Sequence, residues 1–168
     1  MLHDVFEAFF KLGIPVIVIS TFAMLRLYGS GELAMDDNQK AVEKKLKNIR
    51  EGERRDKGRF GNLLETQWFR FGGGFYGAAA VWTFIVVEVQ DILRFVQNFT
   101  GFDELFEAGL GALIGGFIAN QVTNFVTAIT WFLFWADGSA IGIWFAVAYG
   151  SFVAAGWLSR MLAQRFAR

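Results

Sequence analysis

Apolar residues are gathered into four long segments, and most charged residues lie outside them. The segments cover about residues 6–27, 68–89, 108–135 and 139–158. A helix that crosses a bilayer needs about 20 mostly apolar residues. The pattern therefore predicts an all-α integral membrane protein, a small bundle of about four transmembrane helices.

Charged residues are concentrated in residues 28–67, between the first two apolar segments. Good helix formers from Asp37 to about Glu51 predict a helix here, with Asp36 or Asp37 as its N-cap. Three apolar residues share one face of this helix: Val42, Leu46 and Ile49. The stripe is long enough to lie on a membrane surface or a partner and too short for a coiled coil. We expect a solvated, partly helical loop.

Composition supports a membrane protein and excludes several classes of site. The 168 residues are 54% hydrophobic and 19% charged, whereas a soluble domain is about 45–50% apolar on a count that includes glycine. The chain has no cysteine and one histidine, His3. Disulfides, thiolate zinc sites and iron–sulfur clusters are therefore excluded, and a multi-histidine metal site is excluded as well.

The charge pattern divides the chain into three regions and leaves one conflict. Residues 1–27 form the N-terminal transmembrane helix, 28–67 the charged loop and 68–168 a three-segment membrane region. The positive-inside rule places the loop in the cytoplasm. Four straight crossings would then place the C-terminal arginines outside, which the same rule disfavours. These arginines are Arg160, Arg165 and Arg168.

An alternative topology removes that conflict. Residues 108–135 are long and carry a polar middle, so they could form a re-entrant hairpin that turns near Gly115-Gly116 or Asn120-Gln121. Three spans plus this hairpin would return the C-terminus to the cytoplasm. A single tilted helix also accommodates the length, so both topologies stay open.

Small residues recur every four positions, which lets helix backbones approach closely in a membrane. The pairs are Gly73 with Gly77, Gly111 with Gly115 and Ala119, Gly138 with Gly142, and Ala146 with Gly150. We expect these residues to pack helices against each other or against a partner.

Two acidic residues in the second apolar segment, Glu88 and Asp91, are candidates for an intramembrane ion or proton site. Their possible polar partners lie in the third segment: Asn120, Gln121 and Asn124. The alternative is purely structural. If the membrane helix begins at an interfacial Trp68, its length of about 20 residues ends near Glu88, so Glu88 lies where the helix leaves the hydrocarbon. Asp91 then pairs with Arg94 at the surface.

Basic side chains of the loop are candidates for contact with anionic lipid headgroups: Lys44, Lys45, Lys47, Arg54 and Arg55. The simpler interpretation is that they only hold the loop in the cytoplasm. Nucleic-acid binding is not expected, because basic and acidic residues nearly balance in this loop.

No catalytic or metal-binding motif accompanies these features, so we expect neither an enzyme nor a cofactor. The leading hypothesis is an accessory, scaffold or assembly subunit of the bacterial inner membrane, packed on other membrane subunits or on copies of itself. The rival is a small transporter or channel component that uses the polar cluster. A third is a lipid-binding protein that uses the basic loop.

Overall fold

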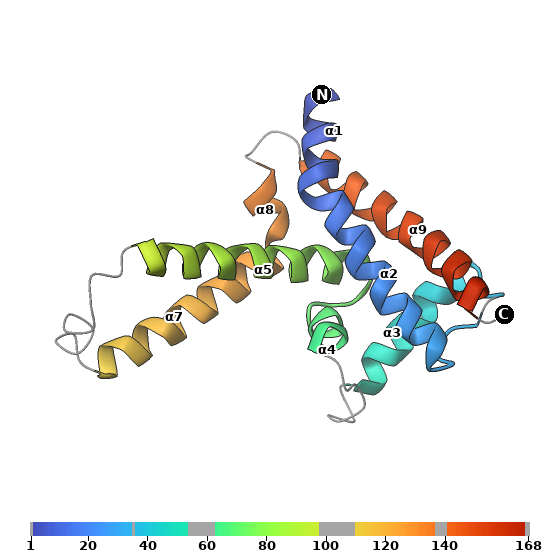
Figure 1. Cartoon of the computed structure of the whole chain (residues 1–168), viewed down its shortest axis with the longest axis horizontal. Coiled ribbons are helices and arrows are strands. Elements are labelled where there is room, and N and C mark those ends of the chain that lie inside the picture. The colour runs from blue at the N-terminus through green and yellow to red at the C-terminus, as the bar shows by residue number, and fades with distance from the viewer. Residues whose placement is uncertain (1, 35, 54–62, 98–109, 137–140, 167–168) are drawn as a thin grey trace.

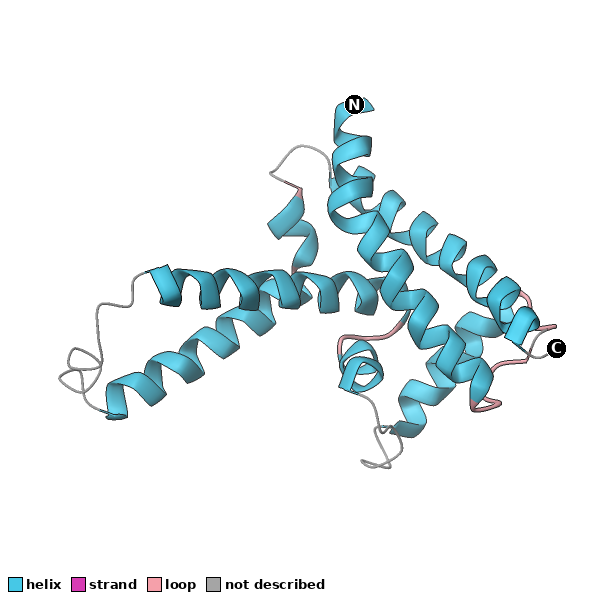
Figure 2. Cartoon of the chain, in the orientation of Figure 1, coloured by secondary structure: helices cyan, strands magenta, loops and turns pink. Residues whose placement is uncertain are grey.

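The computed structural model describes residues 2–34, 36–53, 63–97, 110–136 and 141–166. Every regular element in this part of the chain is helical, which confirms the all-α prediction (Figure 2). The elements are α1 (Leu2–Ala8), a π-helix η1 (Phe9–Gly13), α2 (Ile14–Gly29), α3 (Gln39–Glu53), α4 (Leu63–Arg70), α5 (Gly74–Gln97), α7 (Leu110–Ile129), α8 (Trp131–Trp135) and α9 (Ile141–Phe166) (Figure 1).

The first three elements form one continuous helical segment with a wide π turn in its middle. Pro15 follows that turn at the start of α2, and proline has no N–H to donate. In an α-helix its partner would be the carbonyl of Lys11. Instead Trp82 Nε1 of α5 donates to that carbonyl at 2.8 Å. The proline therefore leaves an acceptor that fastens α5 to the N-terminal segment.

Helices α2 and α9 pack side by side and run in the same direction (Figure 1). A Cβ added to Gly13 would lie 2.9 Å from Ser151 Oγ. Further along, Ser159 Oγ lies 3.6 Å from Met24 Sδ, and Arg160 Nε donates to the Tyr28 hydroxyl at 3.2 Å. Residue numbers rise together along both helices, so the two helices are parallel.

The continuous N-terminal helical segment that ends in α2, and helix α9, are also long and apolar enough to cross a membrane. The candidate spans are Leu2–Gly29 and Ile141–Arg165, with mean hydropathies of 2.0 and 1.6. The first and last of four straight crossings would run antiparallel, which is not the direction found here. If α2 and α9 both cross, the end of α9 emerges beside the charged loop, as the positive-inside rule prefers.

The second apolar segment is interrupted where we expected it to be continuous from Trp68. Gly72, Gly73 and Gly74 have φ angles of 106°, 67° and 60°, a left-handed region that favours glycine. The chain turns there, and α5 begins at Gly74. Trp68 is fully buried and donates from Nε1 to the Gly74 carbonyl at 2.7 Å. The prediction of Trp68 as an interfacial residue is therefore wrong.

The third apolar segment contains one long helix and one short one. Helix α7 continues through Gly115-Gly116 and Asn120-Gln121, so the re-entrant turn predicted at those pairs is wrong. The helical path is broken at Thr130 instead, with φ −95° and ψ 32°. Beside the break, the Tyr76 hydroxyl donates to the Ile129 carbonyl. A side chain of α5 thus satisfies a backbone group at the end of α7.

Helices α5 and α7 form an antiparallel pair that projects from the α2–α9 body, and we name it the α5–α7 hairpin (Figure 1). Its outer surface is apolar: Ile85, Val89, Ile92, Phe117, Ile118, Val122 and Val126 are exposed. At its base, an aromatic group joins it to the body. Trp135 stacks on Trp144 with ring centroids 5.8 Å apart, and Trp131 contacts Phe145 at 4.9 Å.

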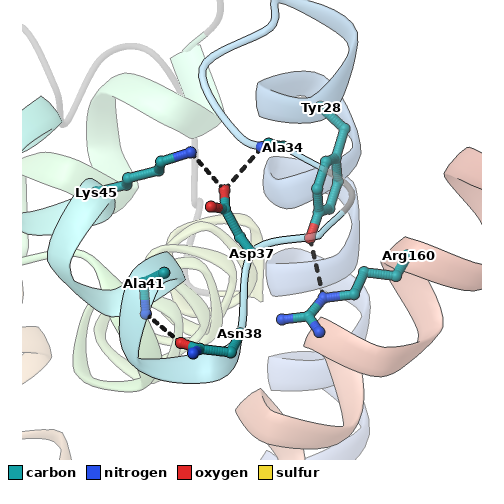
Figure 3. Close-up of polar contacts among 7 residues, drawn as sticks. All are labelled: Tyr28, Ala34, Asp37, Asn38, Ala41, Lys45 and Arg160. Atoms are coloured by element: carbon teal, nitrogen blue, oxygen red, sulfur yellow. Dashed lines mark hydrogen bonds and ion pairs between the residues drawn. The ribbon is translucent and has the colours of Figure 1, made fainter.

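Helix α3 packs on the body through the predicted apolar stripe. Val42 and Leu46 are buried and Ile49 is half-buried against the core. The N-cap is Asn38, whose Oδ1 accepts the Ala41 N–H at 2.9 Å (Figure 3), so the predicted cap at Asp36 or Asp37 is wrong. Asp37 is engaged elsewhere, with the Ala34 N–H and the Lys45 ammonium.

Candidate functional site

The structure brings together four of the five polar residues predicted for an intramembrane site. Gln121 Nε2 donates to both carboxylate oxygens of Glu88, at 3.1 and 3.2 Å. Asn124 Nδ2 donates to Glu88 Oε1 at 2.9 Å and to Asp91 Oδ2 at 2.8 Å. One amide group of α7 therefore bridges two carboxylates of α5. We call these four residues the carboxylate–amide cluster.

The position of the cluster follows from the glycine turn. Because α5 begins at Gly74 and ends at Gln97, Glu88 lies well inside the helix. The helix therefore continues past Glu88, and the interpretation that it leaves the hydrocarbon at this residue stays a prediction. Its surface pair is present nonetheless, since Arg94 Nη1 lies 3.5 Å from Asp91 Oδ1. Asn120, the fifth candidate, is exposed on α7 outside the cluster.

Burial and charge define the chemistry available to the cluster. The Asn124 side chain is only 4% exposed, whereas Glu88, Asp91 and Gln121 are half-buried. Neutral amides are the hydrogen-bond donors to Glu88, and amides donate hydrogen bonds without cancelling a carboxylate charge. Such a group can clamp two helices together, and it can also hold or pass a proton between neighbouring carboxylates. Within the described residues, no group of three or more metal-ligating side chains occurs.

Only some of the residues predicted to pack helices are in close contact with the rest of the chain. Gly77 is in close contact, because an added Cβ would lie 2.5 Å from the Trp68 carbonyl oxygen. Gly73 belongs to the glycine turn. An added Cβ at Gly115, Gly142 or Gly150 would meet nothing within 4 Å. Ala119 and Ala146 are exposed. Gly138, and the surroundings of Gly111, lie outside what the structure describes.

The prediction missed the contacts that join α2 to α9. These involve Gly13, the last residue of η1, and a row of small residues on α9: Ala148, Ser151, Ala155 and Ser159, all buried. The same small-residue spacing is present in the sequence, and it could have been found by extending the search to serine. The predicted row on α9 occupies the other side of that helix and continues to Ala154, which is also exposed.

The basic residues of the loop differ in what surrounds them. Lys45 forms an ion pair with Asp37 at 2.6 Å, so it is occupied within its own chain. Lys44 and Lys47 are exposed. Arg54 and Arg55 lie outside the described residues.

Comparison with known protein families, with curated proteins and with solved structures finds no match for this chain.

Proposed function

We propose that the chain is a non-catalytic integral membrane protein that serves as an accessory or scaffold subunit. It packs through the outer face of α9 on a helix of another membrane subunit or of a second copy. We place it in a bacterial inner membrane, with residues 28–67 and the C-terminus in the cytoplasm.

The observation that carries this proposal is the outward row of small residues on α9. The row comprises Gly142, Ala146, Gly150 and Ala154, all exposed. Nothing lies within 4 Å of a Cβ added at Gly142 or Gly150. Rows of this kind let helices approach closely in lipid, where van der Waals packing drives association. Since α2 covers the opposite side of α9, this outer row is available to a partner helix.

The parallel direction of α2 and α9 supports the proposed topology. If α2 and α9 cross the membrane in the same direction, the chain must cross back between them. The total number of crossings is then odd, which fits three better than four. One return between them gives three crossings, the number of spans in the three-span alternative. The apolar outer surface of the α5–α7 hairpin suits lipid, although an antiparallel pair by itself brings the chain back to the side it left.

Filling the outer row tests the proposed subunit role. Gly150→Leu should reduce the amount of partner recovered with the tagged chain from native membranes in mild detergent. Gly29→Leu is the matched control, because Gly29 also has nothing within 4 Å of an added Cβ and lies at the end of α2. A wild-type chain that purifies as a monomer without partners would contradict the proposal.

A second candidate function, proton or cation transport, is favoured by the carboxylate–amide cluster. Two carboxylates that share a bridging amide inside an apolar hairpin are a plausible relay. In proteoliposomes with an internal pH dye, Glu88→Gln combined with Asp91→Asn should abolish proton flux, whereas Asn120→Ala should preserve it. Equal flux in wild-type and empty vesicles would exclude proton transport.

A further inference from the structure

A half-buried arginine lies where the ends of α2 and α9 meet. Arg160 Nε donates to the Tyr28 hydroxyl at 3.2 Å. Tyr28 is only 8% exposed, and Arg160 is half-buried. Because a guanidinium is planar and its N–H groups have fixed directions, this bond sets the orientation of the whole group. We name the pair the Tyr28–Arg160 junction.

The terminal nitrogens of Arg160 are left without an acceptor. Figure 3 shows Nε facing the Tyr28 hydroxyl and the terminal nitrogens turned away from it. Among the described residues, neither terminal nitrogen forms a hydrogen bond or an ion pair. Donors of a charged group that lack acceptors cost free energy, and the planar fork of arginine fits two oxygens of a phosphate. The junction therefore presents donors of the kind that bind phosphate.

The acidic residue nearest to the junction in Figure 3, Asp37, is already engaged. Its Oδ2 accepts from the Lys45 ammonium at 2.6 Å and from the Ala34 N–H at 2.7 Å. Lys45 first, then the Ala34 N–H and more weakly the charge of Arg160 lower the pKa of Asp37. Two cations thus share one carboxylate, which leaves one positive charge among these three groups. This balance favours an anion at Arg160.

The junction lies at the depth expected for lipid headgroups. Helix α9 begins at Ile141, so Arg160 follows about 20 residues later, the length that a helix needs to cross the hydrocarbon. Trp157 is 66% exposed and precedes Arg160 by three residues, so the two side chains share a helix face. Tryptophan is enriched at the membrane–water interface. Both observations place Arg160 at the edge of the bilayer rather than inside it.

We propose that the Tyr28–Arg160 junction binds the phosphate of a phospholipid headgroup. The terminal nitrogens of Arg160 donate to two phosphate oxygens, and an acyl chain extends past Trp157 toward the membrane centre. A guanidinium held in one orientation distinguishes this site from the exposed lysines of the loop, which attract anionic lipid as point charges. The proposal rests on the proposed crossing of α9, which places Arg160 at the headgroup level.

Native mass spectrometry of the full chain in detergent tests the proposal. The detergent contains equal amounts of phosphatidylglycerol and of diacylglycerol, which lacks the phosphate. We expect one retained phosphatidylglycerol per chain and little diacylglycerol. In Arg160→Gln the affinity for phosphatidylglycerol should fall about tenfold, because charge-assisted hydrogen bonds are lost. Circular dichroism shows whether each variant keeps its helices.

Two matched variants separate binding from structural effects. Tyr28→Phe also loses the hydrogen bond of the junction but keeps the guanidinium, so it should retain most of the affinity. Arg165→Gln removes an exposed arginine of the same helix and should bind as the wild type does. An equal loss in Arg160→Gln and Tyr28→Phe would show that the junction is only structural. An equal loss in Arg160→Gln and Arg165→Gln would show non-specific attraction, and either result would overturn the proposal.

Inorganic phosphate distinguishes a lipid from a soluble ligand. An excess of inorganic phosphate should leave phosphatidylglycerol bound, because it has no acyl chain to pack beside Trp157. Displacement of the lipid would overturn the lipid assignment and identify a site for soluble phosphate. Equal retention of diacylglycerol would remove the phosphate contact altogether. These measurements use no bilayer and no partner, whereas the subunit role is measured by partner recovery from membranes, so the two proposals can fail separately.

Discussion

The guanidinium of Arg160, near the end of α9, donates from Nε to the hydroxyl of Tyr28, near the end of α2, at 3.2 Å. This contact fixes the direction of the last helix relative to the first. Because α2 and α9 pack along their length and their C-terminal ends meet at this contact, the two helices run parallel. Arg160 and Arg165 therefore lie in the part of α9 that ends beside the start of the charged loop.

Accessibility of introduced cysteines should show the same arrangement in a membrane. The natural chain has no cysteine, so single variants give clean labelling. In sealed vesicles, Lys44→Cys and Gln164→Cys should react with an impermeant maleimide from the same side, and His3→Cys from the opposite side. All three positions are exposed. Labelling of positions 164 and 3 from one side would contradict the parallel arrangement.

Much of the fold could be predicted from hydropathy, because length and composition decide which segments become apolar helices. The long helices correspond to the predicted segments, and α3 lies where the charged helix was expected. The glycine turn was missed because Gly73 and Gly77 have the spacing of a packed helix face. A turn differs from such a helix face in the left-handed φ angles of Gly72, Gly73 and Gly74, and the spacing of glycines does not reveal these angles. The direction of α9 was missed because it depends on the end of the body that the chain reaches after the α5–α7 hairpin.

Part of the carboxylate–amide cluster could be anticipated from the sequence. Acidic residues on α5 were candidates with amides on α7 as possible partners, since unpaired polar groups in an apolar region find each other. Asn120 was also included, because it lies one turn from Asn124 on the same helix. It precedes Gln121 by one residue, about 100° around the helix. The sequence does not say which side of Asn124 faces α5, and the structure places α5 on the Gln121 side.

Gly77→Ala should destabilise the fold. An added methyl group would lie 2.5 Å from the Trp68 carbonyl oxygen, and backbone yields less easily than a side chain. We expect the free energy of unfolding to fall by about 1–3 kcal/mol. Gly116→Ala on α7 meets nothing within 4 Å and should leave stability unchanged or slightly higher. Thermal unfolding in detergent measures both, and equal melting temperatures would contradict the close contact.

Trp82→Phe should loosen the attachment of α5 to the N-terminal segment. The substitution keeps an aromatic ring and removes the N–H that donates to the Lys11 carbonyl. The expected loss is about 0.5–1.5 kcal/mol in the free energy of unfolding. Trp157→Phe is the control, because Trp157 is an exposed tryptophan on α9. Faster hydrogen exchange around the π-helix in Trp82→Phe alone would support the contact, and identical exchange in both variants would oppose it.

Asn124→Ala should weaken the α5–α7 hairpin. The variant removes the amide that bridges Glu88 and Asp91, and the expected cost is about 1–3 kcal/mol. Gln121 and Arg94 remain to contact the two carboxylates, so the loss should be local. Asn120→Ala is the matched control on the same helix. Hydrogen exchange in α7 should rise only in Asn124→Ala; an equal rise in both would argue against the bridge.

Acid should release the contact between Asp37 and Lys45. The Lys45 ammonium, and then the Ala34 N–H, lower the pKa of Asp37 below its usual value. A carboxyl whose pKa is lower in the folded state stabilises the fold above its unfolded pKa, and this contribution is lost as the pH falls through the folded pKa. The contact should therefore persist down to the unfolded pKa of an aspartate, about 3.9, and be lost only at a lower pH. Asp37→Asn should remove this acid-dependent loss of stability, whereas Asp36→Asn, at an exposed neighbour, should retain it. Thermal unfolding from pH 3 to 7 compares the variants, and identical profiles for both would refute the assignment.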